Sequence, residues 1–285
     1  MSLWIDEPGA LQRLDSVDPS HRDHIRQLIE DGVTVLRRAV SPELCDRATV
    51  DFIRYCDEHP ESADFQDEHG LHSRLCNFHF ASVPLLAIGL QPEILGFLDS
   101  IFEAPAAIAT SLFFERGSQQ DIHRDSPHFH TNPEGRFFGV WTALQDVSSD
   151  NGPLAYYVGG HKATVDRLEI RDSMPDASPE EMYLEYQARV VAACKQSGLD
   201  LVEAIDIGKG DVVIWHPQLP HGGAPVRNPT LSRRSTVFHY LPAGHQMRGG
   251  DVFFSDSYPT GLLPTLSVAG REMFDLGSPI FVPNV

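Results

Sequence analysis

The chain has 285 residues, of which 41% are hydrophobic and 22% charged, so it can bury a sizeable core within one domain. Its 40 acidic residues against 22 basic ones give a formal net charge of −18, which excludes a basic surface for nucleic acid and disfavours anionic membranes. No run comes near the ~18 uninterrupted apolar residues of a membrane span. The opening MSLWIDEPG lacks the runs of a signal peptide, and the four widely spaced cysteines argue against a disulfide framework, so we expect a cytoplasmic protein.

Residues 1–105 are predicted to form a mostly helical front. Apolar residues at helical spacing predict a helix over 21–30, followed by a short strand over 33–36. Ser41 is a typical N-cap, since a proline and an acid follow it, and it opens a second helix. A third helix is predicted over 91–102.

From about residue 106 the pattern changes to short β-rich runs separated by Gly, Pro, Asn and Asp, which indicates a barrel or sandwich. Strands are predicted over 107–114, 137–144, 154–158, 211–215 and 235–241. Between them, Ser178 opens a helix over 178–195 that could wall or cover the mouth of the barrel. No linker stands out, so we expect one domain over 1–285, made of a helical front 1–105, a β core 106–245 with an insert at about 163–206, and a C-terminal extension 246–285.

One segment, with the sequence IHRD, has the spacing of paired metal ligands. Side chains separated by one residue on a strand point to the same face, so His123 and Asp125 can hold one ion from a single segment. His221 follows a predicted strand and is the best candidate for a third ligand, with His216 as an alternative that we expect to serve in packing. Two histidines and one carboxylate are the ligand set of non-haem Fe(II) oxygenases.

A second feature is the pair Arg233-Arg234 at the start of the last predicted strand. A dicarboxylate such as 2-oxoglutarate needs a fixed bidentate donor for its distal carboxylate, and a guanidinium group provides one. Alternation along a strand lets only one of the two side chains face inward. The pattern leaves open which of them does so, and whether both instead pair with surface acids.

Taken in order, the segments IHRD, FFGVWTALQDVSSDNGPLAYYVGGHK, GKGDVVIWHPQLPHGGAP and RRSTVFHY resemble the phytanoyl-CoA dioxygenase family of Fe(II)- and 2-oxoglutarate-dependent oxygenases. The resemblance covers roughly residues 107 to 241 and extends more loosely to DGVTVLRRAVSPEL near the N-terminus. It implies a mainly β fold, namely a double-stranded β-helix (a jelly-roll or cupin-like core) with flanking N-terminal helices and an inserted helix.

The resemblance also implies roles for individual residues. His123, Asp125 and His221 would be the iron ligands, and Arg233 rather than Arg234 would clamp the distal carboxylate of 2-oxoglutarate. Trp141 matches a family tryptophan that packs along this cosubstrate, although a tryptophan on a core strand can equally serve in packing alone.

The chain departs from the family pattern in four places. The family often has a hydroxyl residue two positions after the distal histidine, where this chain has Gly223, so that contact is lost or supplied elsewhere. The residue between the paired ligands is a glutamine in the name-giving enzyme and Arg124 here. His128 and His130 follow the ligands and either line the substrate pocket or cap a loop. The insert at about 163–206 has no close match and is expected to determine substrate choice.

The implied activity is an Fe(II)- and 2-oxoglutarate-dependent dioxygenase that uses O₂ to oxidise, most often to hydroxylate, an unactivated C–H bond of a small organic molecule, with release of succinate and carbon dioxide. Related radical halogenases have a small residue in place of the carboxylate ligand, so Asp125 favours hydroxylation, desaturation or ring formation. The alternatives are a catalytically silent metal or metabolite sensor of the same fold, or a cupin-type isomerase or dioxygenase that would not need Arg233. A secondary metabolite or an amino-acid-like compound is the expected substrate, and the oligomeric state is open.

Overall fold

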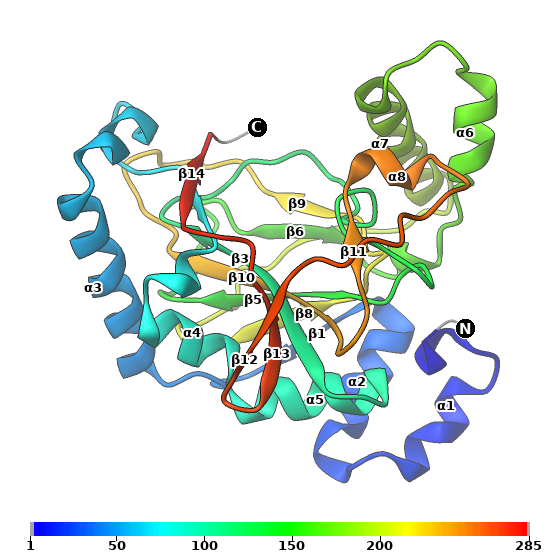
Figure 1. Cartoon of the computed structure of the whole chain (residues 1–285), viewed down its shortest axis with the longest axis horizontal. Coiled ribbons are helices and arrows are strands. Elements are labelled where there is room, and N and C mark those ends of the chain that lie inside the picture. The colour runs from blue at the N-terminus through cyan, green and yellow to red at the C-terminus, as the bar shows by residue number, and fades with distance from the viewer. Residues whose placement is uncertain (1–2, 284–285) are drawn as a thin grey trace.

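The computed structural model of the chain describes residues 3–283 and places a layer of helices against a large β-sheet (Figure 1). The helices are α1 (Ala10–Arg13), α2 (Pro19–Asp31), α3 (Pro42–Glu58), α4 (Val83–Gly89), α5 (Pro92–Phe102), α6 (Arg167–Ser173), α7 (Pro179–Gln196) and α8 (Gly250–Phe253). The strands are β1 (Val33–Leu36), β2 (Arg74–Cys76), β3 (Ala106–Phe114), β4 (His130–Thr131), β5 (Phe138–Ala143), β6 (Leu154–Tyr157), β7 (Leu201–Glu203), β8 (Val212–Trp215), β9 (His221–Gly223), β10 (Ser235–Pro242), β11 (Met247–Arg248), β12 (Thr265–Val268), β13 (Arg271–Phe274) and β14 (Ile280–Val282).

The helices of the N-terminal front begin and end at the signals in the sequence. Asp18 accepts a hydrogen bond from the backbone N–H of Ser20 at the start of α2, and Gly32 ends this helix with a left-handed φ of 80°. Ser41 caps α3 by accepting from the backbone N–H of Leu44. The three predicted helices of this part and the strand β1 are therefore confirmed.

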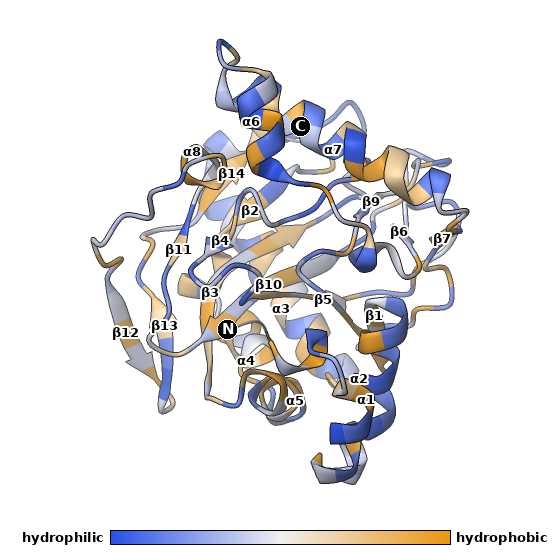
Figure 2. Ribbon diagram, turned by 90° about the vertical axis from the view of Figure 1, so that its right-hand side faces the viewer, coloured by the Kyte–Doolittle hydropathy of each residue, from blue (hydrophilic) through white to orange (hydrophobic). Residues whose placement is uncertain are grey.

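Residues Val83–Phe102 form a stretch of mean hydropathy 1.5 that is long and apolar enough to cross a membrane. In the fold this stretch is two helices, because α4 ends at Gly89 and Pro92 begins α5. Most of the apolar side chains of α5, and Ile88 of α4, are buried in the main hydrophobic core, whereas Val83 at the start of α4 is exposed. Figure 2 shows the same concentration of hydrophobic residues on α5 and on the central strands β3 and β10. This stretch is accordingly part of the core of the fold.

The β core consists of a large sheet and a small sheet whose inner faces pack together. The large sheet has nine strands and runs in the order β1-β8-β5-β10-β3-β13-β12, with β2 and β14 added beside β3. The small sheet has the order β7-β6-β9. Trp141 of β5, Val237 of β10 and Leu154 of β6 share one hydrophobic cluster between the two sheets, whereas Phe238 faces the helices. Two facing sheets of this kind form the jelly-roll core that the sequence predicts, and the five predicted strands are confirmed.

The insert and the C-terminal segment lie at the edges of this core. α7 begins with a complete capping box, in which Ser178 and Glu181 exchange hydrogen bonds. It packs with α6 and α8 through a separate apolar cluster that includes Tyr186, Val190 and Phe253, and these helices lie apart from the α2–α5 layer (Figure 1). The chain then returns to the large sheet, where β14 pairs with β2.

Candidate metal centre

His123, Asp125 and His221 converge in one buried cluster. Their potential ligand atoms all lie within 4.8 Å of one another. His123 Nε2 is 3.6 Å from Asp125 Oδ1, and His221 Nε2 is 3.5 Å from Asp125 Oδ2. These separations are longer than hydrogen bonds and match ligand atoms that surround a common centre. The structure thus brings together the three residues that the sequence singles out.

A pair of reciprocal backbone hydrogen bonds holds the two histidines side by side. The N–H of His123 donates to the carbonyl of His221 at 2.8 Å, and the N–H of His221 donates to the carbonyl of His123 at 2.9 Å. The segment around His123 forms only this single bridge and is not the regular strand on which the sequence argument relies. The two ligands of the segment still converge, because the backbone of Arg124 is fixed by the side chain of Gln187 and not by a neighbouring strand.

The remaining polar atoms of these side chains are used to orient them. His123 Nδ1 lies 2.7 Å from the carbonyl oxygen of Asp121, and His221 Nδ1 lies 3.0 Å from that of Leu219. A ring that donates from Nδ1 presents the lone pair of Nε2 to the centre, which is the usual arrangement of a metal-binding histidine. Trp215 Nε1 donates to Asp125 Oδ2 at 3.1 Å and fixes the carboxylate.

The protonation states also suit a metal ion. Burial lowers the pKa of His221 to about 4, although the charge of Asp125 opposes this, so the ring is neutral near pH 7. Burial by itself would raise the pKa of Asp125, but the surrounding imidazoles, above all His221, hold it well below its usual range. A carboxylate and the neutral imidazole of His221 are therefore preformed beside His123, and this donor set fits a divalent iron ion.

His216, the alternative ligand, lies outside the cluster. Its Nε2 is 2.9 Å from Asp6 Oδ1, and its Nδ1 accepts a hydrogen bond from the backbone N–H of Gln218. Both ring nitrogens are thus engaged with other partners, and His216 ties the N-terminal segment to the β core.

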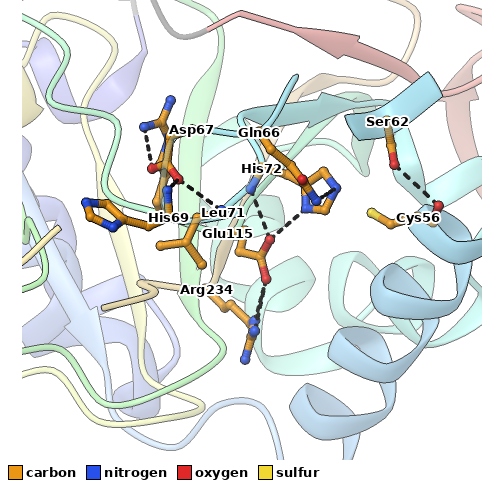
Figure 3. A network of polar contacts seen from close by, with 10 residues as sticks. Cys56, Ser62, Gln66, Asp67, His69, Leu71, His72, Glu115 and Arg234 are labelled. Carbon is orange, nitrogen blue, oxygen red and sulfur yellow. Dashed lines mark hydrogen bonds and ion pairs between the residues drawn. The ribbon is translucent and has the colours of Figure 1, made fainter. Parts of the chain in front are cut away.

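Arg233 and Arg234 have different environments, and Figure 3 shows that of Arg234. Arg234 donates through Nε and Nη2 to Glu115, which also accepts from the ring and the backbone N–H of His72. Burial would raise the pKa of Glu115, but these hydrogen bonds outweigh it and keep the pKa below its ordinary value. Arg234 is therefore neutralised by the buried carboxylate of Glu115, and it does not line the pocket that Arg233 lines.

Arg233 is only 4% exposed and has no such partner. Among the described side chains, the guanidinium group of Arg233 has one hydrogen bond, from Nη1 to Ser235 Oγ at 2.6 Å, and its Nε is buried without an acceptor. Its guanidinium carbon lies 5.4 Å from the ring centre of Trp141 and 5.8 Å from that of Phe114. Burial lowers the pKa of Arg233 to about 10, so the group stays charged at neutral pH. A buried cation without an acid fits a carboxylate supplied by a ligand.

One pocket joins the metal cluster to Arg233. It is lined by the three candidate ligands and by Arg233 and Trp141. It is also lined by residues that the sequence argument did not select, among them Ser118, Trp215 and His239. His239 lies on β10 two residues after Val237, with Nε2 at 3.6 Å from Asp125 Oδ2. The alternation that carries Arg233 and Val237 inward could have indicated this histidine.

The structure also shows what replaces a hydroxyl side chain at position 223. A Cβ atom added to Gly223 would lie 2.6 Å from Ser118 Oγ and 2.6 Å from the backbone nitrogen of Gln119. The hydroxyl group of Ser118 thus occupies the space of the missing side chain and lines the same pocket.

The other residues that depart from the family pattern either anchor neighbouring segments or lie at the rim of the pocket. Arg124 points away from the metal cluster and donates to the carbonyls of Gly160 and Ala163 in the segment that leads into the insert. His128 lies at the rim with its ring 5.0 Å from that of Tyr183. His130 belongs to β4 and packs against Phe253, so it does not line the metal pocket.

A jelly-roll core that carries a buried His–Asp–His cluster defines a cupin-like protein. The donor atoms of this cluster are those of a mononuclear metal centre. The family model for phytanoyl-CoA dioxygenase matches residues 28–235. The chain therefore belongs to the phytanoyl-CoA dioxygenase family, as the sequence motifs predict.

Phytanoyl-CoA dioxygenase domain-containing protein 1 of Rattus norvegicus is 23% identical over 188 residues, which cover 65% of this chain and 59% of that protein. The chain thus spans less than two thirds of the length of this relative.

Solved structures show the same fold at low sequence identity. The non-haem α-ketoglutarate-dependent carbocyclase SnoK from nogalamycin biosynthesis is similar with a TM-score of 0.63 and 17% identity, over 88% of this chain and 95% of that chain. The epimerase SnoN, in complex with Fe³⁺, α-ketoglutarate and nogalamycin RO, has a TM-score of 0.61 and 18% identity, over 94% and 99% of the two chains. The predicted jelly-roll fold is confirmed by this likeness.

Proposed function

We propose that this chain is an Fe(II)- and 2-oxoglutarate-dependent dioxygenase that oxidises a small organic molecule. The observation that carries the proposal is that a buried His–Asp–His cluster and an unpaired, buried Arg233 line one pocket. A metal site alone would not need a second, isolated cation at this depth, whereas a dicarboxylate cosubstrate would. Family membership and the likeness to SnoN, which binds iron and α-ketoglutarate, support this assignment.

In this proposal His123, Asp125 and His221 hold the iron. The bound iron supplies the activation of O₂ and the oxidative decarboxylation of 2-oxoglutarate, which yields succinate and carbon dioxide while a C–H bond of the substrate is oxidised. The backbone carbonyls of Asp121 and Leu219 keep the two imidazoles in the tautomer that binds a cation.

At the other end of the pocket, Arg233 binds the distal carboxylate of the cosubstrate. Ser235 accepts from Arg233 Nη1 and fixes the guanidinium plane. Trp141 packs along the cosubstrate while its ring also faces the guanidinium group. Apolar and aromatic side chains, among them Phe114 and Val237, line this part of the pocket and exclude water from it.

Hydroxylation is the proposed outcome, because Asp125 occupies the place that a halide would need. Two similar structures are named as a carbocyclase and an epimerase, so closely related folds direct the same chemistry to other products. For this chain we propose a secondary metabolite or an amino-acid-like substrate.

The four cysteines are unpaired and Cys45 and Cys194 are buried, which supports a reducing, cytoplasmic setting.

The test is succinate formation by the purified protein with Fe(II), 2-oxoglutarate and O₂, with and without candidate substrates. Wild-type protein should form succinate, and His123→Ala and Asp125→Ala should reduce it to the background rate. Nickel binding, measured by calorimetry, should weaken in the same variants. Tight binding of metal and 2-oxoglutarate without succinate across a broad substrate panel would instead identify a sensor, and near-normal turnover in either variant would refute the ligand assignment.

A further inference from the structure

A further cationic side chain, Arg74 on β2, faces the same side of the large sheet as the pocket. Arg74 pairs in register with Phe114 of β3, and Cys76 pairs with Leu112. Phe114 and Leu112 both line the pocket, whereas Leu75 packs in the outer core with the helices. Directly opposed residues of paired strands share a face, so the side chain of Arg74 extends from the inner face of the sheet beside the pocket.

Arg74 has no anionic partner in the part of the chain that the structure describes. Among the side chains that the structure describes (residues 3–249 and 252–283), no acidic group forms an ion pair with it, and its Nε is buried without a hydrogen-bond acceptor. Its two counterparts nearby differ in this respect, since Arg116 pairs with Asp67 and Arg234 pairs with Glu115. Native proteins seldom leave a buried donor unused, so the geometry indicates a partner that is not part of the chain.

Two aromatic side chains stand near Arg74 at the rim of the site. His128 donates its backbone N–H to the carbonyl of Asp125 at 2.8 Å, and Tyr183 lies one turn before Gln187 on α7. Desolvation lowers the pKa of His128, and the charge of Arg74 lowers it further. Burial raises the pKa of Tyr183, while Arg74 acts in the opposite direction. The charge of Arg74 thus acts on both rings, and these two rings lie 5.0 Å apart beside the segment that carries Asp125.

The charges inside the site favour an anion at this position. Asp125 is a buried acid that lines the pocket. It opposes the charges of Arg74, Arg233 and a bound divalent ion, and 2-oxoglutarate brings two carboxylates. One positive charge is then left over, and a substrate with a single negative charge would neutralise it.

We propose that Arg74 is a substrate-binding residue that holds a carboxylate of the substrate at the mouth of the pocket, so that the substrate is a small organic acid. The inference rests on the proposed function, because Arg233 is taken to bind the cosubstrate. His128 and Tyr183 then flank the acid, and the C–H bond to be oxidised lies between its carboxylate and the metal.

The experiment measures binding and not turnover. The protein is loaded with Ni(II) and saturating 2-oxoglutarate, and ligand-observed NMR gives the affinities of acids and their matched amides, such as 3-phenylpropanoate and 3-phenylpropanamide, hexanoate and hexanamide, or N-acetylleucine and its amide. At least one acid should bind wild-type protein about 10-fold or more tightly than its amide, because an ion pair is lost in the amide. Arg74→Gln should abolish this preference, and Arg74→Lys should retain much of it.

Arg54→Gln is the matched control, because Arg54 lies on the outer surface of α3 in an ion pair with Asp51. It should keep the preference of wild-type protein. Equal binding of every acid and its amide, or a preference that survives Arg74→Gln, would overturn the inference. A loss of 2-oxoglutarate affinity in Arg74→Gln would overturn it as well, since the residue would then serve the cosubstrate. Failure of wild-type protein to bind Ni(II) or 2-oxoglutarate would count against the proposed function instead, and the acid–amide comparison on metal-free protein would still test Arg74.

Discussion

Gln187 in the middle of α7 hydrogen-bonds both backbone groups of Arg124, the residue between the two candidate ligands His123 and Asp125. Its Oε1 accepts from the N–H of Arg124 at 2.9 Å, and its Nε2 donates to the carbonyl at 3.2 Å. One amide side chain thus replaces the neighbouring strand that would otherwise hold this segment. The inserted helix is therefore attached directly to the segment that carries His123 and Asp125.

Removal of this amide should disturb the metal centre. Gln187→Ala would leave both backbone groups of Arg124 unpaired and would free the ligand segment to move. We expect Ni(II) binding to weaken by about 10- to 100-fold, the range found for residues that orient metal ligands. Calorimetry with Ni(II) and the absorption spectrum of the Co(II) form are the measurements. Gln196→Ala, at the exposed end of the same helix, is the control and should bind as wild type; unchanged affinity in Gln187→Ala would contradict the prediction.

The two neighbouring arginines should have separate roles. Arg233→Ala removes the cation that faces the pocket, and we expect the apparent KM for 2-oxoglutarate to rise by roughly 10- to 150-fold, the equivalent of a lost charge-assisted hydrogen bond of about 1.5–3 kcal/mol. Steady-state kinetics with varied 2-oxoglutarate provide the measurement. An equal rise in KM in Arg234→Ala would show that the roles are assigned wrongly.

Arg234→Ala should act on stability. It removes two hydrogen bonds to the buried carboxylate of Glu115, which then retains only His72 as a partner. An incompletely paired buried charge costs several kcal/mol, so the melting temperature should fall while the KM for 2-oxoglutarate stays near that of wild type. Differential scanning calorimetry of both variants separates the two effects.

Ser118 should contribute to cosubstrate binding, because its hydroxyl occupies the space of a side chain at position 223. We expect Ser118→Ala to raise the apparent KM for 2-oxoglutarate by roughly 2- to 10-fold, as for the loss of one hydrogen bond of about 0.5–1.5 kcal/mol. Ser149→Ala, at an exposed loop position, is the control. A KM that does not change in Ser118→Ala would mean that the position merely fills space.

The metal-free protein should lose stability in mild acid through His79. This residue is only 2% exposed, and burial lowers its pKa from 6.5 to about 4. Below pH 6.5 the unfolded chain binds a proton that the folded protein does not, so the free energy of unfolding falls as the pH decreases toward 4. The contribution is about 2 kcal/mol between pH 6.5 and 5. Urea unfolding at these two pH values should show a smaller pH dependence in His79→Gln than in wild type, and an equal slope in both would contradict the assignment.

Local signals in the sequence were sufficient for the main helices and for the five central strands, and they brought His123 and Asp125 forward as candidate metal ligands. The N-cap serines at positions 41 and 178 each accept the hydrogen bond that their helices need at the start, because capping depends only on the next three residues. A single residue separates His123 from Asp125, so any backbone conformation that turns both side chains to the same side brings them together. His221 follows a predicted strand, which makes it the best candidate for the third ligand, and the family motifs support this choice.

The family resemblance implies that Arg233 faces the pocket, but the residue pattern leaves the choice open and only the tertiary structure gives the physical reason for it. All eight residues of β10 are buried, so the strand has no polar face from which alternation could be read. The register of β10 between β3 and β5 turns Val237 and hence Arg233 toward the small sheet, and it turns Arg234 toward Glu115. The bridge between His123 and His221, the attachment of Arg124 to Gln187 and the position of Arg74 depend in the same way on contacts between distant segments. Such contacts form only when burial and long-range hydrogen bonds pack the whole chain, and local sequence does not encode them.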